Sequence, residues 1–240
     1  MTLIATVVEE IDNHKTFCTF VDSKTTRVDR LGALRKKFRL FKIGTDAYYN
    51  DQYGYIVGSG KTLYFDTIVD AYTSGMSSEV LNIFNTSNST YAVSKFIKRE
   101  FEQIIDIFKS QSEEKSGNIV TSFSISIVYP NLFIHANYKF EFEIFSCKLL
   151  QFPENGLSHG SGSSAFNMLS DVFTPYDDRY RLSFKTISKL AIWSVESTEF
   201  PMYQIYFDTN DLIQCREYKN FEDEGQLIDL HDYPELYLRV

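Results

Sequence analysis

The stretch from Gly54 to Tyr72, GYIVGSGKTLYFDTIVDAY, contains the change of pattern that decides the fold. Tyr53–Val57 is a short run of aromatic and β-branched residues, which is typical of a strand. Beyond the glycines, apolar residues recur at the spacing of one helical face over Thr62–Tyr72, namely Phe65, Ile68, Val69 and Tyr72. A strand, a glycine turn and a helix are therefore predicted to follow one another.

The turn between this strand and helix matches the second half of the phosphate-binding pattern G-x-x-x-x-G-K-[ST]. Such a loop cradles phosphate with backbone N–H groups while its lysine reaches the outer oxygens. Gly60, Lys61 and Thr62 fit the pattern, but its leading glycine would stand at position 55, which holds Tyr55. Nucleotide binding is therefore the weaker alternative, and these glycines need another explanation.

The residues before this stretch are rich in strand signals. Thr2–Glu9 and Thr16–Val21 are predicted to form a hairpin across the polar turn Asp12–His14. Phe38–Ile43 is predicted as a third strand, ahead of the polar stretch 44–52. The first quarter of the chain is therefore expected to be mainly β.

After the opening stretch, helical and strand patterns alternate. A long helix is expected over Ala92–Lys109, where apolar residues share one face. Strands are expected at 122–127 and 138–144, where polar and apolar residues alternate. The remaining predicted elements are helices at Ser164–Phe173 and Arg181–Glu196, and strands at Met202–Phe207 and Leu212–Tyr218.

This order of elements predicts an α+β fold, a four-layer αββα sandwich in which helices cover both outer faces of two packed antiparallel sheets. No repeat, linker or break in composition divides the chain, so we expect one domain over 1–240. Its core is expected at about 2–218, followed by a C-terminal extension at 219–240 that the pattern does not place.

The composition narrows the class of function. The chain has 240 residues, 43% of them hydrophobic, and a formal net charge of -8. Because a nucleic-acid surface needs concentrated positive charge, nucleic acid is not an expected partner. Three widely spaced cysteines and four histidines without a ligand spacing indicate free thiols, no metal and no cofactor. The start lacks a leader pattern and no run is long enough to span a membrane, so we expect a cytoplasmic protein without a membrane partner.

Four short segments resemble motifs of a known family and occur in the family's order. They are VDSKTT at Val21–Thr26, KKFRLF at Lys36–Phe41, VGSGKT at Val57–Thr62 and HGSGSS at His159–Ser164. These segments are similar to the A-D-S-R-A-T, K-K-V-x-x-I, A-G-G and G-S-G-S motifs of the proteasome β-subunit family of N-terminal nucleophile (Ntn) hydrolases. The HslV peptidase branch belongs to the same family. The resemblance extends over about 2–218.

The resemblance implies a catalytic site. Thr2 stands where the family has its nucleophilic threonine, and removal of the initiator methionine would free its α-amino group. An amine with an ordinary pKa of roughly 7.7 to 8.0 can act as the base for a hydroxyl. Lys37 would lower the proton affinity of the site, and Asp22 would hold Lys37 in place. The resemblance assigns two further residues, Gly58, whose N–H would stabilise the oxyanion, and Ser161, near the α-amino group.

The function implied by the resemblance is a threonine-type peptidase or other amidohydrolase that uses no cofactor. Its substrate would be a peptide or protein, it would self-assemble into a ring or stacked homo-oligomer, and an ATPase unfoldase is a candidate partner. One family motif, D-x-x-S-G-G, is absent, because the chain reads VESTEFPMYQ there, with Glu196 and Glu199 as substitutes for the aspartate. A catalytically inactive structural subunit and a nucleotide-binding protein remain open as alternatives.

Overall fold

The computed structural model contains strands and helices in an order close to the predicted one. It describes residues 3–11, 13–22, 37–45, 51–59, 62–87, 89–111, 122–139, 144–150, 157–160, 163, 168, 200–220 and 222–233. The strands are β1 (Ile4–Ile11), β2 (His14–Asp22), β3 (Phe38–Thr45), β4 (Asp51–Ser59), β5 (Ser122–Tyr129), β6 (Leu132–Lys139), β7 (Ile144–Leu150), β8 (Leu157–His159), β9 (Met202–Phe207), β10 (Ile213–Tyr218) and β11 (Gln226–Ile228). The helices are α2 (Thr62–Ala71), a π-helical turn (Tyr72–Met76), α3 (Ser77–Ser87), α4 (Thr90–Gln111) and a 3-10 turn (Leu230–Asp232).

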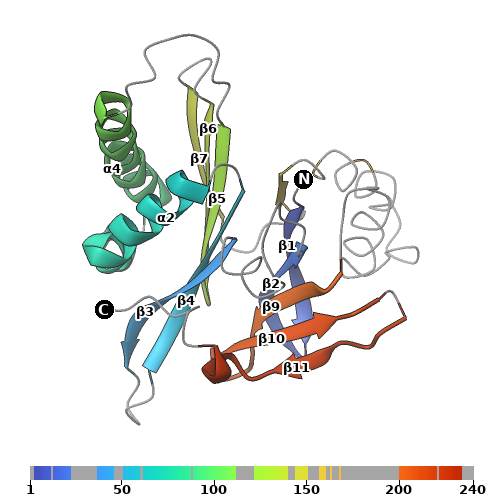
Figure 1. Ribbon diagram of the computed structural model, residues 1–240. Coiled ribbons are helices and arrows are strands. Elements are labelled where there is room, and N and C mark those ends of the chain that lie inside the picture. Colours follow the sequence, from blue (N-terminus) through green and yellow to red (C-terminus); the bar gives the residue numbers. More distant parts are fainter. Residues whose placement is uncertain are drawn as a thin grey trace.

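Two antiparallel sheets form the centre of the structure, as the sequence predicts (Figure 1). One has the strand order β11-β10-β9-β2-β1-β8, and the other has the order β3-β4-β5-β6-β7. The predicted N-terminal hairpin is β1–β2, in which Ile4 pairs with Val21 and Ile11 with His14. Asn13 in its turn has a φ of 62°, a conformation that asparagine tolerates better than most residues.

Helices α2, α3 and α4 cover one face of the five-stranded sheet (Figure 1). Helix α4 buries Val93, Ile97 and Phe101, which recur every four residues and so lie on one side of the helix. No helix in the described ranges is both long and apolar enough to cross a bilayer. The helices predicted at 164–173 and 181–196 lie outside the described residues, so the second helical layer stays a prediction.

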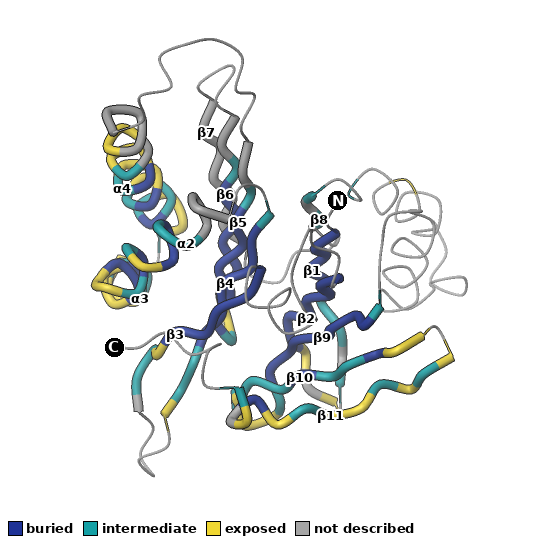
Figure 2. Tube along the Cα trace, viewed as in Figure 1, coloured by how far each residue is buried: buried dark blue, intermediate teal, exposed yellow. Residues whose placement is uncertain are grey.

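A second apolar cluster fills the space between the two sheets, where the strands are buried (Figure 2). The Phe17 ring of β2 lies 5.7 Å from the Phe133 ring of β6, and the Tyr55 ring of β4 stacks on Phe207 of β9 at 5.5 Å. Each aromatic pair joins one sheet to the other. The middle strands β4, β5 and β6 therefore bury residues on both faces, against helices on one side and against the other sheet on the opposite side.

The bounds of β6 differ from the sequence prediction at both ends, and burial on both faces explains the difference at its start. The predicted strand at 138–144 belongs to two strands, because β6 ends at Lys139 and β7 begins at Ile144. The start of β6 at Leu132 and its tight hairpin with Tyr129 of β5 were not predicted. Leu132, Phe133 and Ile134 are all buried, so this part of β6 shows no alternation of polar and apolar residues.

Two further segments were also missing from the sequence prediction. Helix α3 follows the π-helical turn directly and contributes Val80 to the helix-covered core. The acidic segment near the C-terminus contains β11, which pairs with β10 through Cys215 and Ile228. Edge strand β11 and the 3-10 turn after it bring this segment against the inter-sheet core through Leu230.

Three buried hydroxyl groups link the two sheets within their apolar core. Thr19 Oγ1 lies 2.8 Å from Thr6 Oγ1 and 2.9 Å from the Tyr55 hydroxyl.

We expect Thr19→Val to lower the free energy of unfolding by about 1 to 3 kcal/mol, because it leaves two buried hydroxyls without their shared partner. Urea unfolding measures this loss. The control Thr86→Val removes an exposed hydroxyl bonded within α3 and should change stability by less than about 0.5 kcal/mol. Equal losses in both variants would contradict a linking role for Thr19.

The Cys215 thiol lies fully buried in β10. Burial raises its pKa to about 12, and the charge of Glu217 acts in the same direction. An exposed cysteine has a pKa of roughly 8.5 and gains thiolate from pH 7 to 9, whereas Cys215 should stay protonated over this range. We therefore expect iodoacetamide to leave Cys215 unmodified in the folded protein and to modify it in urea, as peptide mass spectrometry would show. Complete labelling of Cys215 without denaturant would contradict this.

Candidate active site

A buried ion pair joins the two sheets at one end. Asp22 is the last residue of β2, and Lys37 immediately precedes β3. Lys37 Nζ donates to Asp22 Oδ1 at 2.7 Å and to the Asp22 carbonyl oxygen at 2.7 Å. Their residue exposures are 4% for Lys37 and 0% for Asp22, so both charges are withdrawn from water. The two residues that the resemblance pairs are thus in direct contact.

The same carboxylate also holds the start of the chain. Leu3 N–H donates to Asp22 Oδ1 at 3.1 Å, and Asp22 N–H donates to the Leu3 carbonyl at 3.4 Å. The Leu3 nitrogen is the peptide nitrogen that follows Thr2, so a few covalent bonds connect it to the predicted nucleophile. Thr2 itself lies outside the described residues. One carboxylate oxygen therefore binds both the Lys37 ammonium and the amide adjoining Thr2.

Opposing effects set the charge state of Asp22. Burial raises the pKa of its carboxyl group above the ordinary range. The Lys37 ammonium, its hydrogen bond and the Leu3 amide lower the pKa, but burial outweighs them. Asp22 Oδ2 is buried and has no hydrogen-bond partner in the described part of the chain. The Lys37 ammonium is therefore the main group that stabilises the ionised form of the buried Asp22 carboxyl group.

The Gly58 amide is engaged within the sheet. Its N–H donates to the Lys37 carbonyl at 2.9 Å, which extends the pairing of Phe38 with Val57 by one residue. Gly58 therefore lies beside Lys37, as the resemblance implies. The role of Gly58 as an oxyanion donor stays a prediction. In that role its N–H would have to leave the Lys37 carbonyl or be shared between this carbonyl and the oxyanion.

The strand conformation around Gly58 also bears on the phosphate-loop alternative. Strand β4 continues to Ser59 and α2 begins at Thr62, while 60 and 61 lie outside the described residues. A phosphate loop needs successive amides that point at the ligand, whereas Gly58 donates to a carbonyl. Tyr55, at the position of the missing glycine, has its side chain in the inter-sheet core. This geometry disfavours a nucleotide site.

Ser161 lies outside the described residues, but the strand before it is placed beside β1. In this pairing Ile4 lies opposite His159, and Thr6 lies opposite Leu157. Gly160 follows with a φ of 92°, and Ser163 N–H donates to the Gly160 carbonyl at 3.2 Å. The turn that begins at Gly160 therefore starts beside the N-terminal end of β1, where Leu3 leads to Thr2.

Arg39 is a buried charge near this site that the sequence predictions did not include. One guanidinium nitrogen donates to the Phe38 carbonyl at 2.9 Å, and another donates to Asp66 Oδ1 of α2 at 3.2 Å. Arg39 lies between Phe38 and Leu40, whose side chains enter the inter-sheet core. The alternation of a strand could have shown that Arg39 faces the helices. The ion pair fixes α2 against β3.

A second polar cluster lies on the inter-sheet side of β5 and β6. Ser126 Oγ is 3.0 Å from His135 Nδ1, and Asn137 Nδ2 is 2.8 Å from His135 Nε2. Both ring nitrogens of His135 are therefore held by hydrogen-bond partners within the sheet. Ser126 is fully buried, and His135 is 4% exposed. This cluster is therefore structural. The described residues also contain no group of three His, Cys, Asp or Glu side chains placed to hold a metal ion.

Comparisons with known proteins give the following likenesses. No protein-family model matches the chain, and no curated protein matches it. The chain is similar to the solved helical assembly of the Anbu complex from Pseudomonas aeruginosa, with 12% sequence identity, 93% of this chain and 88% of that chain covered, and a TM-score of 0.49. It is also similar to Anbu from Hyphomicrobium sp. strain MC1, with 13% identity, coverage of 98% and 92%, and a TM-score of 0.49. Anbu (ancestral beta-subunit) from Yersinia bercovieri shows 12% identity, coverage of 98% and 90%, and a TM-score of 0.47.

Proposed function

We propose that this chain is a proteasome-like hydrolase of peptide or other amide bonds that uses Thr2 as its nucleophile after removal of Met1. The observation that carries the proposal is the contact of one buried carboxylate, that of Asp22, with both Lys37 and the Leu3 amide. A buried lysine and aspartate at the end of two sheets are costly for stability unless they are paired, and their pairing fixes the ammonium beside the start of the chain. The sequence resemblance at Val21–Thr26 and Lys36–Phe41 supports the same assignment.

The register of β1 supports Ser161 as a further member of the site. Strands β1 and β8 are antiparallel, and Ile4 pairs with His159 and Thr6 with Leu157. One residue toward the N-terminus in β1 therefore corresponds to one residue toward the C-terminus in β8. The segment that leads to Ser161 therefore starts beside the end of β1 that leads to Thr2. We propose, as the resemblance implies, that the Ser161 hydroxyl lies near the Thr2 α-amino group.

The proposed chemistry follows from these positions. The Thr2 hydroxyl attacks the substrate carbonyl carbon while its proton passes to the α-amino group, and the Lys37 charge favours the developing alkoxide. The α-amino group then protonates the departing amine, which leaves an ester between the acyl group and Thr2. Water, deprotonated by the same amine, hydrolyses this ester and restores the site. Asp22 holds Lys37 throughout and touches no reacting atom.

Two measurements on the purified chain test the proposal. The intact mass should correspond to a chain that begins at Thr2, because an amide nitrogen at that position cannot act as a base. The same sample should hydrolyse fluorogenic peptide amides. Retention of Met1 in the assembled protein, or no hydrolysis across a set of peptides that vary at the residue before the cleaved bond, would reject the proposal.

A catalytically inactive structural subunit is the second candidate, and the Gly58 hydrogen bond favours it. An amide that already donates to the Lys37 carbonyl at 2.9 Å does not offer a free donor to an oxyanion. This candidate predicts a multimeric mass by light scattering and no labelling of a free Thr2 by a peptide epoxyketone. Covalent labelling of Thr2 would reject it, and a light-scattering mass equal to one chain would reject the assembly that both candidates assume.

A further inference from the structure

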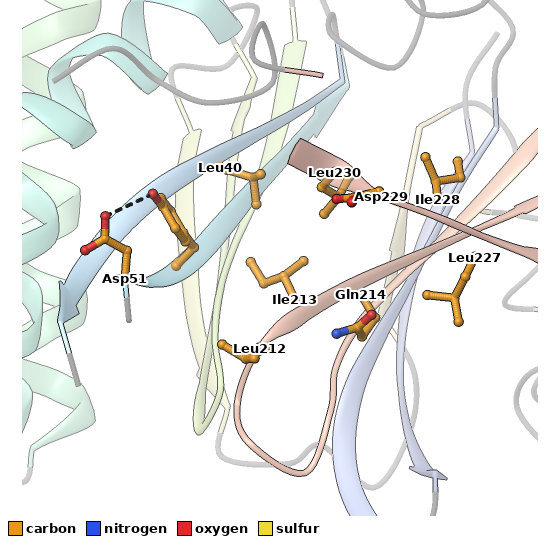
Figure 3. A pocket seen from close by; sticks show the side chains of 10 residues that line it. Leu40, Asp51, Leu212, Ile213, Gln214, Leu227, Ile228, Asp229 and Leu230 are labelled. Carbon is orange, nitrogen blue, oxygen red and sulfur yellow. Dashed lines mark hydrogen bonds between the residues drawn. The ribbon is translucent and has the colours of Figure 1, made fainter. Parts of the chain in front are cut away.

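A cavity of about 490 Å³ lies between the two sheets, and the edge strands β3 and β11 both contribute to its lining. Figure 3 shows the side chains around this common space. Most of them are aliphatic, and they come from both sheets and from the segment after β11: Leu40, Leu212, Ile213, Leu227, Ile228 and Leu230. Protein interiors contain few voids larger than a water molecule, so a largely aliphatic space of this size is unusual unless something occupies it.

Two leucines of this cavity are exposed to solvent. Leu227 on edge strand β11 is 55% exposed, and Leu212 just before β10 is 38% exposed. Leu40 and Leu230, by contrast, are buried in the inter-sheet core. The lining therefore runs from the apolar core to an apolar rim that water can reach. Apolar side chains that cover this rim would remove its leucines from water, which is favourable.

Polar side chains of the cavity lining bind other side chains of the protein. The Asp51 carboxylate binds Lys42 Nζ at 2.6 Å and accepts a hydrogen bond from the Tyr53 hydroxyl at 3.4 Å. The Gln214 side-chain amide donates to Asp208 Oδ2 at 3.0 Å. The aliphatic surface is therefore the main feature that the cavity offers for binding, and an apolar occupant matches it.

The last described residue of the chain, Tyr233, lies close to this cavity. Leu230, which lines the cavity, begins the 3-10 turn, and the Tyr233 N–H donates to the Leu230 carbonyl at 3.0 Å. The Tyr233 side chain also packs against the inter-sheet core. Residues 234–240, which lie outside the described residues, therefore continue from a point that is fixed beside the cavity.

The sequence of residues 234–240 is PELYLRV, and we call this segment the tail. Leu236, Leu238 and Val240 alternate with more polar residues, which is the pattern of an extended segment with one apolar face. At about 3.4 Å per residue, an extended tail gives Leu238 a reach of roughly 17 Å from the last described residue. The tail is therefore long enough to pass back across the cavity.

We propose that the tail occupies this cavity of its own chain in an extended conformation, with Leu236 and Leu238 against Leu212 and Leu227. The aliphatic lining accounts for the leucines, and the alternation accounts for the solvent-facing side of the tail. A tethered segment is favoured over a separate molecule, because a short tether gives it a high effective concentration at the cavity. The tail would thus cover the inter-sheet core between edge strands β3 and β11.

Crosslinking of the full chain tests where the tail lies. In a chain that carries Leu227→Cys and Leu238→Cys, we expect bismaleimidoethane, a short thiol crosslinker, to join positions 227 and 238 within one chain. A denaturing gel and a peptide map would show this link. Each single variant controls for reaction with the native cysteines. The pair Glu79→Cys with Leu238→Cys should not be joined, because position 79 is exposed on α3, away from the cavity.

Thiol labelling tests which face of the tail is covered. In the full chain with Leu227→Cys, addition of Leu236→Asp and Leu238→Asp should raise the rate of labelling by N-ethylmaleimide at least about fivefold, because unpaired charges do not remain in an aliphatic cavity. The matched pair Tyr237→Asp with Arg239→Asp places two aspartates on the opposite face of an extended tail. This control should change the labelling rate by less than about twofold.

Three results would overturn the proposal. The first is the absence of a link between positions 227 and 238, and the second is a link only between two chains, which would place the tail on a second copy. The third is an equal labelling rate in the two pairs of tail variants. Neither measurement involves Thr2 or hydrolysis, so failure here is distinguishable from failure of the proposed function.

Discussion

Replacing Thr2 with alanine is expected to lower hydrolysis of a fluorogenic peptide amide by at least about a thousandfold. The change removes the attacking oxygen but keeps the α-amino group, and loss of a nucleophile in a hydrolase typically costs between about 10³ and 10⁶ in rate. Alanine at position 2 is small, so removal of Met1 should continue. Steady-state kinetics with purified protein measures the effect.

The matched variant for this experiment is Thr2→Ser, which keeps a hydroxyl at the same position. It should retain measurable activity, whereas Thr2→Ala should not. Intact masses of both variants must show chains without Met1, so that a loss of activity reports on the hydroxyl and not on processing. Hydrolysis by Thr2→Ala at the rate of the unaltered chain would assign the activity to another residue and end the threonine mechanism.

Lys37→Met is expected to lower the free energy of unfolding by about 3 to 5 kcal/mol, because it leaves the buried Asp22 carboxylate without its cation. Asp22→Leu should cost a similar amount, since it leaves the Lys37 ammonium buried. The double variant, Asp22→Leu with Lys37→Met, removes both charges and should cost much less than the sum of the two. Urea unfolding of the four proteins gives the coupling free energy of the pair.

An exposed ion pair in the same chain provides the control. Lys98 and Glu102 of α4 lie 3.8 Å apart, with side-chain exposures of 53% and 47%. Lys98→Met should change stability by less than about 0.5 kcal/mol, because water already screens this pair. Additive losses for Asp22→Leu and Lys37→Met would show that the buried pair is not coupled in solution. Every member of this cycle that lacks Lys37 should also lose hydrolytic activity, even where the double variant recovers stability.

Local sequence predicts the elements that carry a clear residue pattern, either a helical stripe of apolar residues or a run of aromatic and β-branched residues. The stretch Gly54–Tyr72 changes from a strand to a helical pattern, and β4 and α2 occur there. Helix α4 was predicted for the same reason, because one side of it is buried and the other is in water. Where both faces are buried, as at Leu132–Ile134, the alternation disappears, and the sequence does not separate β6 from its neighbours.

The residue types of the candidate site could also be predicted from short motifs, but their contacts could not. The motifs name Asp22 and Lys37, and the tertiary structure joins them across two sheets at 2.7 Å and places the Leu3 amide on the same carboxylate. Strand register decides that the Gly58 amide donates to the Lys37 carbonyl, which no pattern of residue types reveals. The inter-sheet cavity is likewise tertiary, because Leu40 and Leu230 are far apart in the chain. The sequence determines which side chains each strand presents on each of its faces. Only the packing of the two sheets determines which of these side chains come into contact and which of them are excluded from water.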